Sequence, residues 1–451
     1  MAATDGIGQS DKPKARRIAS AALPLYLTMI ASSAAGIVDA SVLGRYGTVS
    51  LAAFAVTMAV FSPAVAAVAG AMRGLMPFVA ANDEDADALV PVVRNGMWLG
   101  ICTGSVAALC VLAVPLIALL MGVPAATREG LGAFPALLAA AVLVTAVGTS
   151  ATTTLVGLGR GKLVMRAGMA GTAAAVVLSL VLVGGVGGFT GLGLPGAGVA
   201  MLASSLISAT LAHRALRRST VLAGHSLRPG PLDLRAVFKI ARVGIPLAAT
   251  VLIKFAVLGV LAMAVARVDT DSTAVHSISI TLVNFMFTAA AATGQATVPI
   301  AAKDAGAGDG AGLRSTVLTG LGVAFGAVVL LCVVLAVARG PLLSLFTHDG
   351  DLRTQIVAIL PLVFVVVVTD GIQALFGFGL IAIKRTVPSL AVFAVVYGLL
   401  AVAAIPVAAA GGLAALWGAL AGANMLLVAG QSFFFFRNSR QSAALGGVAA
   451  A

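Results

Sequence analysis

The sequence predicts an all-α integral membrane protein with twelve transmembrane helices in two pseudo-symmetric six-helix lobes. Of its 451 residues, 60% are hydrophobic and only 10% are charged, and long apolar runs recur along the whole chain. A soluble globular protein carries about 25% charged residues, and roughly 20 consecutive apolar residues are enough to cross a bilayer. The chain is therefore expected to cross the membrane many times.

Cutting the chain at polar and Gly/Pro clusters predicts the twelve spans. Their approximate ranges are 18–43, 50–80, 91–121, 129–158, 163–188, 192–212, 236–266, 273–302, 313–338, 352–382, 387–410 and 412–436. The first run follows a basic stretch, as in a signal peptide, but it continues past Leu43 and is too long for a cleaved segment. We interpret it as the first span.

The basic residues predict the orientation of the chain. With both termini in the cytoplasm, the cytoplasmic segments hold 21 of the 28 Lys and Arg residues and the outer segments hold five. Such an excess is typical of the cytoplasmic side, so we expect an inner-membrane protein with both ends inside. The net charge of +12 comes from bases scattered through short loops. It therefore predicts no nucleic-acid partner.

The chain also divides into two similar halves. At a constant offset of 222 residues, like residues align as Pro24/Pro246, Arg45/Arg267, Pro77/Pro299, Gly100/Gly322 and Lys162/Lys384. We expect an N-lobe at 18–212, a cytoplasmic linker at 213–235 and a C-lobe at 236–437. Cytoplasmic tails are expected at 1–17 and 438–451. Two such halves around a central cleft are a common design for alternating access.

Three titratable residues lie deep within the apolar spans: Asp39, Lys254 and Asp370. A charge at bilayer depth costs at least about 2.5–3.5 kcal/mol on insertion scales, so such residues are usually functional. We expect them to handle a moving ion or a charged substrate. The three cysteines, in contrast, lie in apolar runs without a Cys-x-x-Cys or His pair, and they predict no metal site.

Several segments resemble one transporter family. The run IVDASVLGRYGTVSLAAFAV at 37–56 resembles the first-span signature of the MATE (multidrug and toxic compound extrusion) transporters, and 244–255 and 369–385 are similar to that family's spans 7 and 10. The resemblance covers about 18–437. It implies two lobes in a V shape and a monomer without a cofactor. It also implies export of cationic amphipathic compounds, driven by protons or sodium ions.

The resemblance also assigns residues. Asp39 and Asp370 match the family's acidic residues in spans 1 and 10, whereas Lys254 stands where a Glu is usual. Ala175 and Ser179 replace the usual Asn and Asp of span 5. Because sodium prefers several oxygen ligands, this depletion favours protons as the coupling ion. A low-dielectric site disfavours a charged carboxylate, so Asp39 is the expected proton carrier.

Lys254 and Asp370 are expected to meet in the C-lobe. At 1.5 Å per residue their axial offset is roughly 9 Å, which a lysine side chain can bridge. Our hypothesis is that Lys254 acts as a tethered cation where relatives bind an ion between two acids. The alternative is a fixed ion pair that only stabilises the C-lobe.

Other intramembrane residues are weaker candidates. The candidates for a substrate cleft are Arg73, Phe61, His276, Asn284, Phe287, Gln295 and Gln373. Arg73 can instead extend to the membrane surface, and the polar residues can instead connect helices. Pro24 and Pro246 occupy equivalent repeat positions and are candidate hinges, because each removes one helical hydrogen bond. Kinked packing without motion is the alternative.

These observations favour a proton-coupled exporter of organic cations over several alternatives. One alternative is a flippase of the wider multidrug/oligosaccharidyl-lipid/polysaccharide flippase superfamily, or an exporter of an anionic or zwitterionic metabolite. A major-facilitator transporter would carry a basic loop between spans 2 and 3, where this chain reads ANDEDADALVP. A membrane-embedded hydrolase needs a catalytic constellation at depth, and the sequence contains none, so we predict no enzyme activity.

Overall fold

A computed structural model describes residues 13–185 and 191–449, and its regular elements in those residues are all α-helices. Their bounds are α1 Lys14–Tyr46, α2 Thr48–Arg73, α3 Met76–Ala80, α4 Ala86–Leu112, α5 Val114–Leu120, α6 Ala125–Gly130, α7 Phe134–Gly157, α8 Gly161–Gly184, α9 Leu194–Arg217, α10 Leu234–Ala266, α11 Thr270–Gly306, α12 Gly310–Val337, α13 Arg339–Ser344, α14 Gly350–Ala382 and α15 Val387–Ala449. Most of the predicted tail 1–17, the end of the predicted span 163–188 and the last two residues lie outside the described residues.

Eleven of the described helical segments are long and apolar enough to cross a membrane. The last of them is two helices joined end to end, because Gly411 and Gly412 have non-helical backbone angles inside α15. Gly412 has a φ of +62°, a conformation that glycine adopts without steric strain. The predicted boundary between spans 387–410 and 412–436 falls at this break. The all-α fold with twelve apolar segments is thus confirmed.

Helix starts follow short-range sequence signals. Asp85, Asp269, Asp309 and Asp349 each accept a backbone hydrogen bond at the start of α4, α11, α12 and α14. Aspartate is a preferred residue at this position because its side chain satisfies a free N–H group of the first turn. The second arm of α15 continues as helix to Ala449, so helix extends into the predicted tail 438–451.

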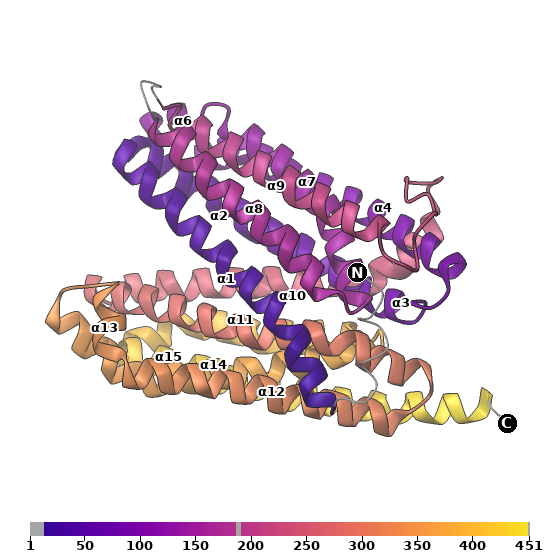
Figure 1. The fold of residues 1–451 in the computed structure, drawn as a ribbon. Helices are drawn as coiled ribbons and strands as arrows, with labels where there is room; N and C mark the ends of the chain where they lie inside the picture. Colours follow the sequence, from indigo (N-terminus) through magenta and orange to yellow (C-terminus); the bar gives the residue numbers. More distant parts are fainter. Residues whose placement is uncertain (1–12, 186–190, 450–451) are drawn as a thin grey trace. The chain divides into compact units, whose positions relative to one another are not determined.

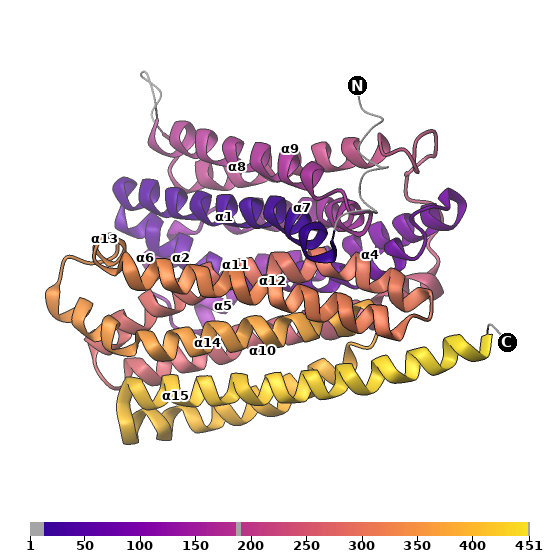
Figure 2. The same cartoon turned by 60° about the horizontal axis from the view of Figure 1, so that its bottom comes forward.

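The helices form two compact units. The N-terminal unit is Leu27–Val251, and the C-terminal unit is Met1–Tyr26 with Leu252–Ala451. In the N-terminal unit α7 packs against α4 and α9, and α9 packs against α8. In the C-terminal unit α14 packs against α11, α12 and α15, and Figures 1 and 2 show these helices side by side.

The unit boundaries differ from the predicted lobe boundaries because α1 and α10 each contribute to both units. In the C-terminal unit, Lys14 at the start of α1 lies 3.6 Å from Asp304 and donates a 3.1 Å hydrogen bond to Thr316. In the N-terminal unit α2 approaches α10 so closely that a Cβ on Gly74 would lie 2.6 Å from the Gly244 nitrogen. Only glycine permits this packing.

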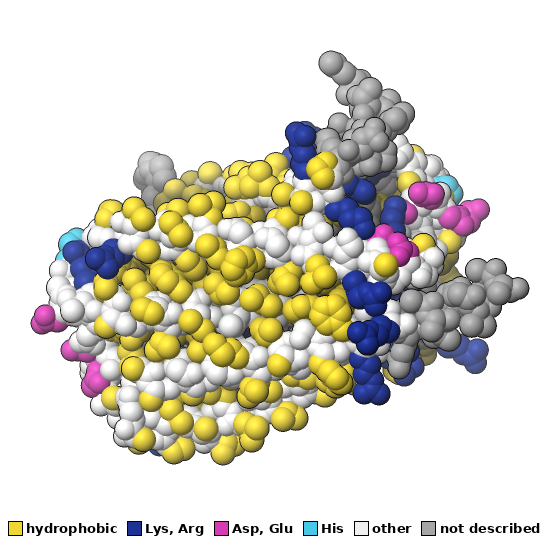
Figure 3. Space-filling model, turned by 90° about the horizontal axis from the view of Figure 1, so that it is seen from below, with side chains coloured by type: hydrophobic (Ala, Val, Ile, Leu, Met, Phe, Trp, Pro, Cys, Tyr) yellow, Lys and Arg dark blue, Asp and Glu magenta, His cyan; other side chains and the backbone are white. Residues whose placement is uncertain are grey.

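The surface matches a bilayer environment. Figure 3 shows hydrophobic side chains (yellow) over the helix faces and Lys and Arg side chains (dark blue) gathered near helix ends. Exposed large hydrophobic residues occur on many helices, among them Leu120, Val337 and Val402. In a soluble monomer such wide apolar exposure is rare, whereas lipid tails cover it. Together with the eleven apolar segments, this describes a multi-pass membrane protein.

Candidate functional site

A lysine and an aspartate from two helices meet inside the C-terminal unit. The Lys254 ammonium on α10 donates a 2.6 Å hydrogen bond to Asp370 Oδ2 on α14. Their side chains are 22% and 3% exposed. The contact expected from the sequence is therefore present. An unpaired buried charge is strongly destabilised, and here each residue supplies the opposite charge for the other.

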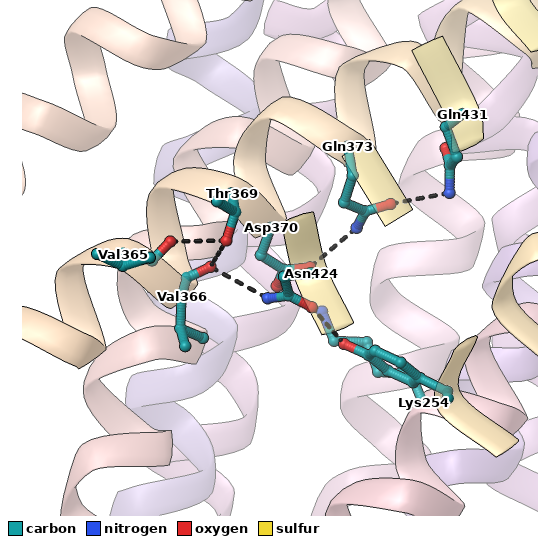
Figure 4. Close-up of polar contacts among 9 residues, drawn as sticks. Lys254, Val365, Val366, Thr369, Asp370, Gln373, Asn424 and Gln431 are labelled. Carbon is teal, nitrogen blue, oxygen red and sulfur yellow. Dashed lines mark hydrogen bonds and ion pairs between the residues drawn. The ribbon is translucent and has the colours of Figure 1, made fainter. Parts of the chain in front are cut away.

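A chain of side-chain amides continues from this pair (Figure 4). Gln373 Nε2 donates a 2.9 Å hydrogen bond to Asp370 Oδ1, and Gln431 Nε2 donates one of 2.9 Å to Gln373 Oε1. Asp370 and Gln373 are three residues apart, so both lie on one face of α14. Both oxygens of the Asp370 carboxylate are thus engaged, one by a cation and one by a neutral amide.

A second polar contact pair lies beside the first. Tyr397 donates a 2.9 Å hydrogen bond to Asn424 Oδ1, and Asn424 Nδ2 donates one of 3.2 Å to the Val366 carbonyl. Asn424 and Gln431 are seven residues, or about two turns, apart on α15, so one helix face supplies both amides. Figure 4 shows Asn424 reaching Val366, one turn before Asp370 on α14.

Several of these groups line a small pocket within the C-terminal unit. Its lining residues are Lys254, Leu258, Ile280, Val283, Asn284, Val366, Asp370, Tyr397, Leu420 and Asn424. The pocket has room for about one water molecule. The Lys254 ammonium also lies 4.2 Å from the centre of the Phe287 ring, a distance typical of a cation–π contact. A carboxylate and an aromatic face thus contact one cation, and here the cation belongs to the chain.

The N-terminal unit holds the third intramembrane charge. Asp39 on α1 is only 4% exposed, and its Oδ1 accepts a hydrogen bond from the Ser179 hydroxyl on α8. Among the described residues no Lys or Arg forms an ion pair with Asp39. Ala175, one turn before Ser179, is buried and has no side-chain oxygen. In the described part of the chain, the Asp39 carboxylate thus has one hydrogen-bond partner, a hydroxyl.

The remaining predicted residues are divided between the two units. Phe61 and Arg73 lie in the N-terminal unit, buried and half-buried, while Gln295 is half-buried in the C-terminal unit. His276 is buried, with its ring edge-on to that of Trp417 at 5.8 Å between ring centres. Asn284, Phe287 and Gln373 do lie at the Lys254–Asp370 site, and their roles stay predictions.

Sequence reasoning missed several neighbours of this site. Tyr397 and Gln431 were not among the predicted site residues. Ser179 was considered only as the residue that replaces a usual acid, yet it is the hydrogen-bond partner of Asp39. The available signal was the rarity of Gln and Tyr within apolar runs. In residues 13–185 and 191–449, no three His, Cys, Asp or Glu side chains are arranged to hold a metal ion.

The sequence is similar to a family of transporters. The sequence profile of the MatE family matches residues 24–181 and 246–407. A protein named "Probable multidrug resistance protein NorM" from Aromatoleum aromaticum is 28% identical over 390 residues, which cover 82% of this chain and 81% of that protein. A protein of the same name from Chromobacterium violaceum is 25% identical over 394 residues, covering 83% and 81%.

Solved structures share the fold. A structure described as an outward-facing conformation of a multidrug resistance MATE family transporter of the MOP superfamily matches with a TM-score of 0.85 at 18% identity, covering 96% of this chain and 97% of that one. A MOP superfamily transporter from Pyrococcus furiosus matches with a TM-score of 0.83 at 17% identity, covering 97% of both chains. Its binding pocket is described as having reverse polarity, which suggests a different function for that protein.

Proposed function

Because the chain belongs to the MatE family of multidrug efflux transporters, we propose that it is a secondary active antiporter. It exports organic cations and drug-like amphipathic compounds in exchange for protons, by alternating access. Relatives that carry the name of multidrug resistance proteins support the substrate class. The protein works as a monomer in the inner membrane with both termini in the cytoplasm, without a cofactor and without enzymatic activity.

The observation that carries proton coupling is the environment of Asp39. Burial without a cationic partner penalises a charge on this carboxylate, and a proton removes that charge. A sodium ion would need several oxygen ligands, whereas Ser179 is the one hydrogen-bond partner of Asp39 in the described residues. Asp39 therefore takes up a proton from one side of the membrane and releases it to the other.

In the C-terminal unit Lys254 acts as a tethered cation. Its ammonium already contacts Asp370 and the Phe287 ring, which are the groups that an external cation would use. A proton on Asp370 neutralises the carboxylate and weakens its hold on Lys254 by removing the charge attraction. Protonation of Asp370 is thus the second proton-linked step of the proposed cycle.

A second candidate follows from the charge of the pocket. Lys254 and Asp370 together carry no net charge, so the pocket does not select cations by charge alone. This favours, as the alternative, an exporter or flippase for an anionic, zwitterionic or lipid-linked metabolite. The two candidate functions share the same coupling groups, so only the identity of the transported compound distinguishes them.

Efflux from proteoliposomes tests these proposals. Vesicles loaded with ethidium, a fluorescent organic cation, or with the anion carboxyfluorescein are given either a proton or a sodium gradient. We expect the proton gradient to drive ethidium efflux, and Asp39→Asn to abolish it. Asp87→Asn is the matched control, since Asp87 is an exposed aspartate of the same unit.

Each result decides one point. Efflux driven by sodium alone, or normal efflux by Asp39→Asn, contradicts proton coupling through Asp39. Efflux of carboxyfluorescein but not ethidium replaces the first substrate class with the second. Ser179→Ala is expected to keep transport but shift its dependence on pH, because it removes the hydrogen bond that the Asp39 carboxylate accepts.

A further inference from the structure

Three more polar side chains lie next to the Lys254–Asp370 pocket. They are His276 and Ser279 on α11 and Trp417 on the second arm of α15. Each precedes, by three or four residues, a side chain that lines the pocket: Ile280, Val283 and Leu420, respectively. Residues at this spacing share a helix face one turn apart. The three side chains therefore form the layer next to the pocket, toward the Thr270 and Gly412 ends of these helices.

These side chains are buried with polar atoms that no described residue satisfies. His276, Ser279 and Trp417 are 4%, 0% and 1% exposed. His276 Nδ1, Ser279 Oγ and Trp417 Nε1 have no hydrogen-bond partner among residues 13–185 and 191–449. A buried unsatisfied polar group costs roughly 1–3 kcal/mol, and such groups in native proteins are usually satisfied by ordered water. Three in one layer indicate a hydrogen-bonding occupant.

The donor set indicates which occupant fits. The Trp417 indole only donates, the Ser279 hydroxyl donates and accepts, and a neutral imidazole donates from one nitrogen and accepts at the other. This mixture suits water, which also donates and accepts. A metal ion would prefer several acceptors, and the layer contains no carboxylate.

We propose that His276, Ser279 and Trp417 hold ordered water that links the Gly412 end of the C-terminal unit to Asp370, and that His276 passes protons along it. The inference rests on the proposed proton-linked role of Asp370. In the transfer, His276 Nδ1 takes a proton from a hydronium ion, and the Nε2 proton leaves through water to the Asp370 carboxylate. The imidazole ends neutral, and Asp370 ends protonated as Lys254 separates from it.

The helices around this layer carry several ionisable groups. Those within the middle of the helices are Lys254 on α10, Cys332 on α12, Asp370 on α14 and Tyr397 on α15, while Asp269, Asp271, Asp351 and Arg353 lie at or near the starts of α11 and α14. Of these, Lys254, Asp370 and Tyr397 line the pocket. Asp370 is the acid among them, so it is the acceptor for a proton that enters through His276.

Infrared difference spectroscopy after a rapid drop in pH tests the proposal on the full-length protein in lipid. A protonated carboxyl group gives its own C=O band, and the band that Asp370→Asn removes belongs to Asp370. We expect His276→Phe to slow the appearance of this band by on the order of 100-fold, the usual contribution of a positioned proton-transfer group. Its final amplitude should stay unchanged. The matched control is His348→Phe, since His348 is an exposed histidine of the same unit.

His276→Phe keeps a ring against Trp417, and Ser279→Ala provides a second variant with a minimal change in shape. A smaller slowing is expected for Ser279→Ala. An Asp370 band that forms at the wild-type rate in both variants overturns the proton path while leaving Asp370 protonation intact. An Asp370 band absent from the wild-type protein overturns the proposed role of Asp370 and the path together. A purely structural His276 would alter thermal stability but not the rate.

Discussion

At the scale of single residues, the intramembrane charges follow from the penalty on an isolated charge at depth. Lys254 and Asp370 satisfy each other directly, at 2.6 Å. Asp39 relies instead on one hydroxyl donor. In the C-terminal unit the carboxylate is thus paired with a cation, whereas in the N-terminal unit the Asp39 carboxylate has no cationic partner among the described residues. This is why we propose Asp39 as the proton carrier.

The first prediction concerns the pair. Lys254→Met and Asp370→Asn are each expected to lower the free energy of unfolding by about 3–5 kcal/mol, because each leaves a buried charge without its partner. The double variant should recover most of this loss. Thermal unfolding in detergent measures the stabilities, with Lys303→Met as a lysine control outside the site.

Transport by the same variants separates structure from coupling. If the pair only holds the unit together, the double variant exports ethidium at the wild-type rate while each single variant fails. If the pair takes part in coupling, the double variant stays inactive despite its recovered stability. Single variants as stable as wild type would contradict the burial argument itself.

At the scale of helices, the ends are decided by local chemistry. Asp269 begins α11 by accepting hydrogen bonds of 2.6 Å from the Ser272 backbone nitrogen and 2.8 Å from the Ser272 hydroxyl. These hydrogen bonds hold the pKa of Asp269 below its ordinary value of 3.8. Because the folded-state pKa is depressed, the cap stabilises the protein above the ordinary pKa. The contribution is lost as the pH falls through the folded-state pKa.

The second prediction follows from the loss of the Asp269 cap at low pH. Asp269→Ala should lower the unfolding temperature at neutral pH, and its difference from wild type should shrink toward zero in strong acid. Asp271→Ala is the control, since Asp271 lies in the same first turn but does not cap the helix. Unfolding temperatures across a pH series provide the measurement. A difference that is the same at every pH would rule out the cap as its cause.

The long helices were predictable from the sequence, whereas the shortest ones were not. Apolar runs and turn residues placed the twelve segments, including the break at Gly411 and Gly412, because hydrophobicity and glycine conformation act locally. The short helices α5, α6 and α13 were not anticipated. Pieces of six or seven residues carry too little periodicity to be distinguished from loops.

At the scale of the whole molecule, α1 and α10 are the helices that run from one unit to the other. Pro24 lies two residues before Tyr26, and Pro246 lies five before Val251, where the respective unit ends. A proline lacks the N–H group for one helical hydrogen bond, so bending is easier there. Both candidate hinges thus stand next to a change of unit.

The third prediction is that Pro24→Ala and Pro246→Ala each slow ethidium efflux severalfold, because the stiffer helix opposes movement of one unit against the other. Stability should change by no more than about 1 kcal/mol, the usual range for a tolerated proline substitution. Pro361→Ala is the control, since Pro361 interrupts α14 wholly within the C-terminal unit. Equal slowing by all three substitutions would point to general packing instead of hinges.

The sequence by itself determined the membrane class, the twelve apolar segments, the two halves at an offset of 222 residues and the three intramembrane charges. Each is a pattern of residues along the chain and is present before the chain folds. Only the tertiary structure decided that Ser179 serves Asp39, and that Tyr397, Asn424 and Gln431 surround the Lys254–Asp370 pair. It also decided that α1 and α10 belong to both units. Such contacts join residues far apart in the chain, and they depend on how each helix is rotated about its axis. A helix that is apolar on all sides has no single apolar face, so its sequence does not reveal this rotation.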